Sequence, residues 1–203
     1  MLVPEVSEGY ASLVLSGIEG HLLREGYFYF VASHRHLPDL IDEYPRLLIA
    51  RSVDGIIAVD TPCPCDLPAP IVKVSVEVRG DGVTSIVLDH DRAADLASHL
   101  AKLGHRRIAL IKGQEFSSDT AARWESIHKA AARLGLEVSP RLTVQLEDDC
   151  ASPELGYRVT KRLLERKVRF TALFSFNDVS AIGAIEALRS HGLNIPRDVS
   201  WLR

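Results

Sequence analysis

Short apolar runs alternate along the chain with stretches whose apolar residues repeat at helical spacing. The clearest example is the apolar run that begins at Thr171, stops at Asn177-Asp178 and passes at once into a helical pattern. Asp178 is predicted to cap this helix, because its carboxylate can accept the free amide hydrogens of the first turn. Gly183 lies inside the helix, where glycine allows a close approach to a neighbouring element. Because polar residues at the carboxyl end of a buried strand bind ligands in open α/β sheets, this junction is also a candidate site.

The same alternation extends over the whole sequence and predicts a parallel α/β fold. Strands are predicted at 1–4, 27–32, 56–59, 71–74, 85–88, 107–111, 142–146 and 171–176. Helices are predicted at 10–22, 37–51, 93–103, 123–134, 155–165 and 178–189. Pro45 predicts a kink or a helix start in the second helix, and residues 112–122 are predicted to be a polar loop.

The number of predicted strands exceeds what one small sheet needs. Strands joined by helices require right-handed crossovers and a parallel sheet that is covered on both faces. We therefore expect two doubly wound lobes, 1–89 and 90–203, that meet near Asp89.

Composition and charge narrow the function classes. The chain has 203 residues, of which 46% are hydrophobic and 25% are charged, and its formal net charge is -3. These values are ordinary for a soluble globular protein, and the charge gives no strong electrostatic footprint for nucleic acid. No apolar run reaches membrane-spanning length, and the residues after Met1 lack the charged and apolar regions of a signal peptide. We expect a cytoplasmic protein with no membrane partner.

The cysteines and histidines give no strong indication of a metal or cofactor. Cys63, Cys65 and Cys150 are three in number and cannot all pair internally, and two cysteines one residue apart do not close a metal site. His34 and His36 form only a weak metal-ligand pattern, because no carboxylate or cysteine has the spacing to complete a site. We expect reduced thiols, solvated histidines and no bound metal or cofactor.

Catalytic motifs are also missing from the sequence. No phosphate-binding loop, nucleophile elbow or zinc-protease motif occurs. Gly80-Asp-Gly82 precedes a predicted strand and therefore indicates a turn, not a dinucleotide-binding loop. We expect a protein that is not an enzyme. A small doubly wound enzyme acting on sugars or nucleotides remains an alternative, which a turnover screen would test.

Several ordered motifs carry a family resemblance. They are Val53–Ile57, Leu103–Ala109, Ser117-Ser118 followed by Arg123, Thr171–Phe174, Asn177-Asp178 with Ala181–Ala184, and Gly192–Ser200. In this order they resemble the effector-binding core of the LacI/GalR family of bacterial transcriptional repressors. The resemblance implies a periplasmic-binding-protein-like fold, in which three crossover strands join two lobes and a small effector binds in the cleft between them. It also implies a homodimer.

The resemblance further implies segments that this sequence does not contain. Family members begin with a helix-turn-helix headpiece and a hinge helix, whereas this chain starts inside the first core strand. After the pattern that ends at Ser200 they continue into further strands. We therefore expect a core that is cut at both ends and incomplete at its C-terminus, with the chain crossing back towards the first lobe near residue 196. DNA would be bound only through the absent headpiece.

Two charged residues match the family's effector-binding positions. Arg123 corresponds to an arginine whose planar fork can hold the vicinal hydroxyls of a sugar or a carboxylate. Asp178 corresponds to an aspartate that accepts hydrogen bonds from effector hydroxyls or ring nitrogens. The structural alternatives are a solvated arginine at a helix start and a carboxylate that only caps its helix.

Four further residues are candidate ligand contacts. Asp89 falls at the first crossover, where His90 stands in place of the asparagine common in the family. Tyr10 either stacks on a flat ring or belongs to the apolar stripe of the first helix. Ser117 and Ser118 either donate hydrogen bonds to the effector from their loop or have no role.

Together these observations predict the ligand-sensing core of a LacI/GalR-type regulator, with a sugar or purine-like effector that shifts the equilibrium between DNA-binding states. The alternative is an exported sugar-binding protein of a transport system, which has the same fold. The upstream reading frame would separate the two, because a headpiece indicates a regulator and a signal peptide indicates transport.

Overall fold

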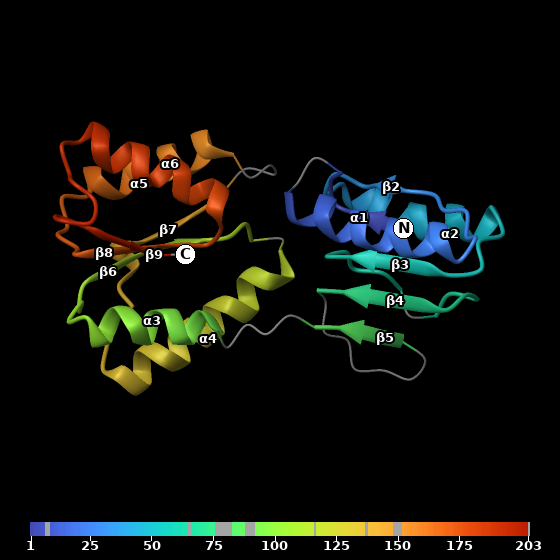
Figure 1. The fold of residues 1–203 in the computed structure, drawn as a ribbon, viewed down its shortest axis with the longest axis horizontal. Helices are drawn as coiled ribbons and strands as arrows, with labels where there is room; N and C mark the ends of the chain where they lie inside the picture. The colour runs from blue at the N-terminus through green and yellow to red at the C-terminus, as the bar shows by residue number, and fades with distance from the viewer. Residues whose placement is uncertain are drawn as a thin grey trace. The chain divides into compact units, whose positions relative to one another are not determined.

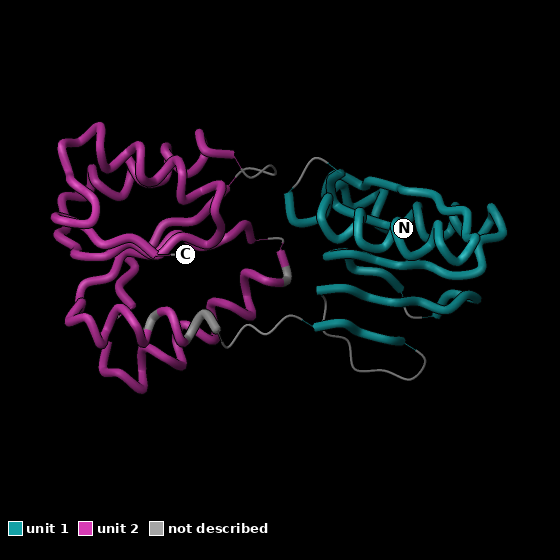
Figure 2. Tube along the Cα trace, in the orientation of Figure 1, with its two compact units in different colours: residues 1–88 teal, residues 89–203 magenta. Residues whose placement is uncertain are grey.

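The computed structural model describes residues 1–6, 9–64, 66–75, 83–87, 92–115, 117–136, 138–147 and 152–202, without the side chains of 92–94, 97 and 118. The chain divides into two compact units, unit 1 (Met1–Leu88) and unit 2 (Asp89–Arg203), which are coloured separately in Figure 2. Each unit is built around its own parallel sheet (Figure 1). The predicted α/β fold with two parallel sheets is therefore confirmed.

Unit 1 has a five-stranded sheet in the order β2-β1-β3-β4-β5. The strands are β1 (Leu2–Val3), β2 (Ala32–Ser33), β3 (Ile56–Val59), β4 (Ile71–Val74) and β5 (Val83–Ile86), and the helices are α1 (Gly9–Arg24) and α2 (Pro38–Ala50). Adjacent residues of a strand point to opposite faces. Leu2 accordingly packs in a cluster with Leu48 of α2, while Val3 packs in a cluster with Leu15 of α1. The two helices therefore cover opposite faces of the sheet.

Unit 2 has a sheet in the order β7-β6-β8-β9. Its strands are β6 (Ile108–Lys112), β7 (Thr143–Gln145), β8 (Ala172–Ser175) and β9 (Ser200–Leu202), and its helices are α3 (Arg92–Lys102), α4 (Ser118–Leu134), α5 (Pro153–Glu165) and α6 (Asp178–Ser190), with a 3₁₀ turn at Pro140–Leu142. Leu173 packs with α5 and α6, and Phe174 packs with Ile127 of α4. Helices thus cover both faces, as Figure 1 shows.

Helices α5 and α6 cross with their backbones in contact, at two glycines. A Cβ atom on Gly183 would overlap the carbonyl oxygen of Pro153 and lie 2.5 Å from the amide nitrogen of Tyr157. A Cβ atom on Gly156 would overlap the carbonyl oxygen of Ser180 and lie 2.7 Å from its Cα. The prediction that Gly183 marks a close helix contact is confirmed.

Several predicted boundaries differ from the structure. The aromatic stretch 27–31 is not assigned to a strand, and only Ala32–Ser33 pairs with β1. The reason is that β1 is short. The amino group of Met1 donates to the carbonyl of Phe30, and the carbonyl of Met1 accepts from the amide of Ala32. Residues 27–29 therefore have no partner in β1. Pro45 neither starts nor ends a helix, because α2 begins at Pro38 and continues through Pro45, which is buried.

The C-terminal stretch also differs from the prediction. Ser200–Leu202 forms β9, which pairs in parallel with β8 inside unit 2. The chain is therefore still part of the unit 2 sheet at Leu202, and no crossing towards the first lobe occurs at residue 196.

Candidate functional site

Both sheets present polar residues at the carboxyl ends of the strands where the strand order reverses. In the order β2-β1-β3 this point lies at the ends of β1 and β3, and in the order β7-β6-β8 it lies at the ends of β6 and β8. Open α/β sheets bind their ligands at such positions. The first half-site is our name for the residues that follow the strands at the carboxyl edge of the unit 1 sheet, together with the side chains that contact them. The second half-site is the corresponding set at the carboxyl edge of the unit 2 sheet.

Arg123 is the best-anchored charge of the second half-site. Its Nη1 donates a hydrogen bond of 2.8 Å to the carbonyl oxygen of Phe176, and its guanidinium carbon lies 4.7 Å from the centre of the Phe176 ring. Its Nη2 is 3.9 Å from Oδ2 of Asp119, one helical turn earlier. These contacts fix the guanidinium, while 33% of the side chain stays exposed. The exposed part of the fork can bind a planar or polyhydroxylated ligand.

The sequence placed Arg123 at the start of its helix, and this was wrong. Helix α4 begins at Ser118, so that Arg123 lies in its second turn. The first turn contains Asp119, whose negative charge interacts favourably with the helix dipole and with Arg123. A cation at this position therefore carries no penalty from the helix N-terminus.

Phe176 and Gly113 were not recognised as site residues from the sequence. A Cβ atom on Gly113 would overlap the hydroxyl of Thr120 and lie 2.5 Å from Cζ of Phe176. Glycine therefore lets the Phe176 ring lie against the end of β6, where it supports Arg123. A glycine two residues after a predicted strand was the available signal.

Asp178 is the first residue of α6 and is exposed, but it is not the cap of the helix. The cap is Asn177, whose Oδ1 accepts a hydrogen bond of 2.9 Å from the amide of Ser180. Asn177 has the extended backbone that an N-cap needs, with φ -146° and ψ 171°. The predicted capping role of Asp178 is therefore wrong. The structure places Asp178 two residues after Phe176, whose carbonyl holds Arg123.

The remaining candidates are the two serines and Asp89. Ser117 is the N-cap residue of α4 by its backbone, yet its hydroxyl makes no capping bond within the described chain. Ser118 is helical, so its predicted place in a loop is wrong. The side chain of Ser118 and the whole of Asp89 lie outside the described residues.

Tyr10 belongs to the first half-site. Its hydroxyl lies 2.7 Å from Oγ of Ser75, which directly follows β4. The side chain is 39% exposed, which rules out the alternative that Tyr10 is a core residue of α1. The hydrogen bond fixes the ring and leaves part of it accessible.

His34, at the end of β2, is buried in a continuous hydrogen-bond chain. Its Nδ1 accepts a bond of 3.1 Å from the amide of His36, which places the ring proton on Nε2. Nε2 lies 3.0 Å from Oγ1 of Thr61, and Thr61 in turn donates to the carbonyl of Val59 at 2.7 Å. Burial, together with the nearby His36, lowers the pKa of His34 to about 4. A proton on Nδ1 would break this chain, so His34 is neutral at physiological pH.

The same geometry argues against the His34 and His36 metal pair. Both ring nitrogens of His34 are engaged in hydrogen bonds. Among the residues that the structure describes, no three histidine, cysteine or acidic side chains come together as a metal site.

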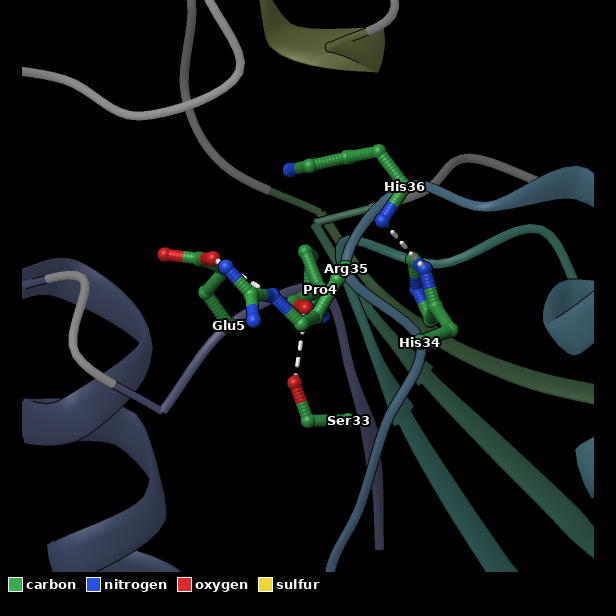
Figure 3. Close-up of polar contacts among 6 residues, drawn as sticks. All are labelled: Pro4, Glu5, Ser33, His34, Arg35 and His36. Carbon is green, nitrogen blue, oxygen red and sulfur yellow. Dashed lines mark hydrogen bonds and ion pairs between the residues drawn. The ribbon is translucent and has the colours of Figure 1, made fainter.

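The ends of β1 and β2 are tied together next to His34, as Figure 3 shows. The carbonyl of Pro4 accepts bonds from the hydroxyl of Ser33 at 2.9 Å and from the amide of Arg35 at 2.8 Å. Nε of Arg35 lies 3.5 Å from Oε1 of Glu5. The side chain of Arg35 is 74% exposed, whereas that of Glu5 is 15% exposed.

Four residues at the strand ends of unit 1 have a left-handed backbone although none is glycine. Their φ angles are 50° for Arg35, 57° for His36, 42° for Asp60 and 70° for Ser75. Such conformations cost about 1–3 kcal/mol each and gather at functional sites. Their position after β2, β3 and β4 coincides with the first half-site.

Comparison with known proteins identifies the family to which the chain is similar. Residues 97–202 match the family of periplasmic binding protein-like domains. The chain is 30% identical over 208 residues to the HTH-type transcriptional repressor PurR of Haemophilus influenzae, covering 98% of this chain and 61% of the repressor. It therefore spans about three-fifths of the length of the curated relatives that it matches. No helix in the described ranges is long and apolar enough to cross a membrane.

Solved structures show the same fold. A LacI-family regulator from Burkholderia phymatum is 28% identical, with a TM-score of 0.82, 99% of this chain covered and 76% of that chain. A sugar-binding LacI-family regulator from Escherichia coli, solved with phosphate, has a TM-score of 0.85 at 24% identity, with the same coverage. The chain belongs to the periplasmic binding protein-like family, and its sequence and fold are those of a LacI/GalR-type effector-binding core.

Proposed function

We propose that this chain senses a small molecule on behalf of a LacI/GalR-type transcriptional regulator. The observation that carries the proposal is the fixed, partly exposed guanidinium of Arg123 at the switch point of the unit 2 sheet, where it is bonded to the carbonyl of Phe176, two residues before Asp178. A guanidinium and a carboxylate together suit a ligand that both accepts and donates hydrogen bonds, such as a sugar or a purine-like ring. Within unit 1, the anchored and partly exposed ring of Tyr10 is a flat surface on which a ligand ring can stack.

Regulation follows from differential binding. An effector that binds one conformation of the core more tightly shifts the population towards it, and thereby changes the affinity for DNA of a headpiece outside this sequence. The relatives are transcriptional repressors and regulators, which favours sensing over transport and over catalysis. The place of action of such a regulator is the cytoplasm.

Arg123→Ala and Asp178→Ala should each weaken effector binding by about 1–3 kcal/mol, because each removes charge-assisted hydrogen bonds. A thermal-shift panel of sugars and purines, including glucose, ribose, sucrose and hypoxanthine, would first identify a ligand, since binding raises the melting temperature. Isothermal titration then compares the variants. Arg189→Ala, which removes an exposed cation near the end of α6, is the matched control. Unchanged affinity in both site variants would remove these residues from the effector site.

We also infer that the chain forms a homodimer through the aromatic segment 27–31. Phe28 is 84% exposed, and Tyr27, Phe30 and Val31 are exposed as well. The segment leads into β2, the edge strand of the unit 1 sheet, so apolar side chains and edge backbone occur together. The same segment of a second copy of the chain would cover both the apolar side chains and the edge backbone, because a two-fold interface brings identical patches together.

The double variant Phe28→Ser, Phe30→Ser should convert a dimer into a monomer, because it removes most of this apolar surface. Light scattering coupled to size-exclusion chromatography measures the mass directly. Leu103→Ser, which changes a 62% exposed apolar residue of unit 2, is the control and should leave the mass unchanged. A dimer that persists in the double variant would place the interface elsewhere.

A further inference from the structure

Unit 2 contains a hollow along β7, the edge strand of its sheet, which we call the β7 groove. Its volume is about 440 Å³. Its polar and aromatic walls are formed by Lys112, Trp124, His128, Gln145, Glu147 and Arg166. Neither Arg123 nor Asp178 lines it. The groove is therefore distinct from the proposed effector contacts, although it adjoins them through α4.

A ladder of three side chains forms one wall of the groove. Nζ of Lys112, the last residue of β6, lies 4.6 Å from the centre of the Trp124 ring, in cation–π contact. Trp124 and His128 are one turn apart on α4, and their rings meet edge to face with centres 4.8 Å apart. The ammonium is thus held at a defined place by the indole, which is itself held by the imidazole.

Among the described residues that line the groove, positive charges exceed negative ones. Within the described part of the chain, the Lys112 ammonium has no carboxylate within ion-pair distance. Glu147 is the carboxylate on the groove wall, and Arg162 neutralises it at 2.9 Å. Arg166 adds a second positive charge. This charge is held in place, because Nη1 of Arg166 donates to three backbone carbonyls, including that of Thr143 at 2.8 Å. A partly buried cation without a counter-charge favours the binding of an anion.

We propose that the β7 groove is an anion-binding site for the phosphate or carboxylate group of a small molecule. Lys112 binds the oxyanion directly while its ammonium stays against Trp124. His128, exposed at the rim, supplies a ring N–H as a second donor. Arg166 adds attraction without direct contact. The site does not require the proposed effector contacts, so the two proposals can fail separately.

The emission of Trp124 provides a direct readout, because an anion at Lys112 changes the charge next to the indole. In the otherwise unchanged chain, Trp201→Phe leaves Trp124 as the single tryptophan, since the sequence contains two. Inorganic phosphate and, in a separate arm, acetate are titrated at constant ionic strength. We expect a saturable change in emission, and the tighter of the two anions identifies the preferred group.

Variants assign the signal to the groove. Lys112→Met and Lys112→Gln should each weaken anion binding at least tenfold, and Lys112→Arg should retain it. Lys129→Met is the matched control, because Lys129 lies on the same helix but is exposed and paired with Glu125 at 2.7 Å. Isothermal titration with phosphate provides a second measurement that does not depend on the indole.

Three results would overturn the proposal. One is the absence of a saturable response to both anions. Another is an unchanged affinity in a folded Lys112→Met or Lys112→Gln variant. The third is a loss of anion binding in Arg123→Ala, which would assign the anion to Arg123 instead of Lys112. Retention of binding in Arg123→Ala supports a separate site, whatever the outcome of the effector experiments.

Discussion

Gly183→Ala should destabilise unit 2 by about 3 kcal/mol, the upper end of the range for overpacking a tight contact. The new methyl group would overlap the carbonyl oxygen of Pro153 and lie 2.5 Å from the amide nitrogen of Tyr157. Both are backbone atoms of α5, so no side chain can move aside. The helices must separate, and the cluster that contains Leu155 and Leu188 loses its close packing.

Chemical denaturation followed by circular dichroism measures this effect. Gly17→Ala in α1 is the matched control, because a Cβ atom there meets nothing within 4 Å. In that helix alanine should stabilise by about 0.5–1 kcal/mol, since glycine is the less favourable helix residue. If the two variants had equal stability, the close crossing of α5 and α6 would not be a tight contact in solution.

The second large effect is a loss of folding stability on acidification, caused by His34. His34 has its pKa lowered to about 4 in the folded chain, against about 6.5 in an unfolded chain. Between these values the unfolded state binds the proton and the folded state does not, so the free energy of unfolding falls as the pH falls. The contribution is fully present above pH 6.5 and is lost on acidification to pH 4. Its size is about 3 kcal/mol, at about 1.4 kcal/mol per pKa unit.

The difference between the wild type and His34→Gln isolates this contribution. Glutamine cannot take up a proton, so the stability difference between the two proteins should vary with pH only in the window from about 6.5 down to about 4. His21→Gln, at an exposed position of α1, is the control and should run parallel to the wild type. A stability difference that stays constant across this window would show that His34 is not buried in its neutral form.

The sequence predicted the alternation of strands and helices well, because parallel strands buried on both faces leave continuous apolar runs. Ile56–Val59 and Ile71–Val74 were predicted with their correct bounds. Boundaries in polar segments were predicted less well. The first turn of α4 contains Ser118 and Asp119, which are typical of loops as well as of helix starts. Only the completed structure shows that Asp119 is buried and paired with Arg123.

The candidate site was predicted in part. The sequence indicated Arg123 and Asp178, and the structure places both next to the end of β8. It could not indicate Phe176, which looks like one more apolar residue of a strand. The role of Phe176 depends on the absence of a side chain at Gly113, which leaves room for its ring, and on the position of α4, both of which are tertiary features. The choice of Asn177 over Asp178 as the cap depends on which of the two residues has the extended backbone, and the sequence does not determine this.

The four left-handed residues at the strand ends of unit 1 have a consequence for directed evolution. Arg35, His36, Asp60 and Ser75 hold side chains where glycine would be less strained. Replacing such a residue by glycine relieves backbone strain. A laboratory selection for heat resistance alone would therefore favour glycine at these positions. Each gain would erase a side chain from the end of a strand, where ligands bind in this type of fold. At these four residues, selection for thermostability therefore favours glycine, whereas selection for ligand response favours the present side chains.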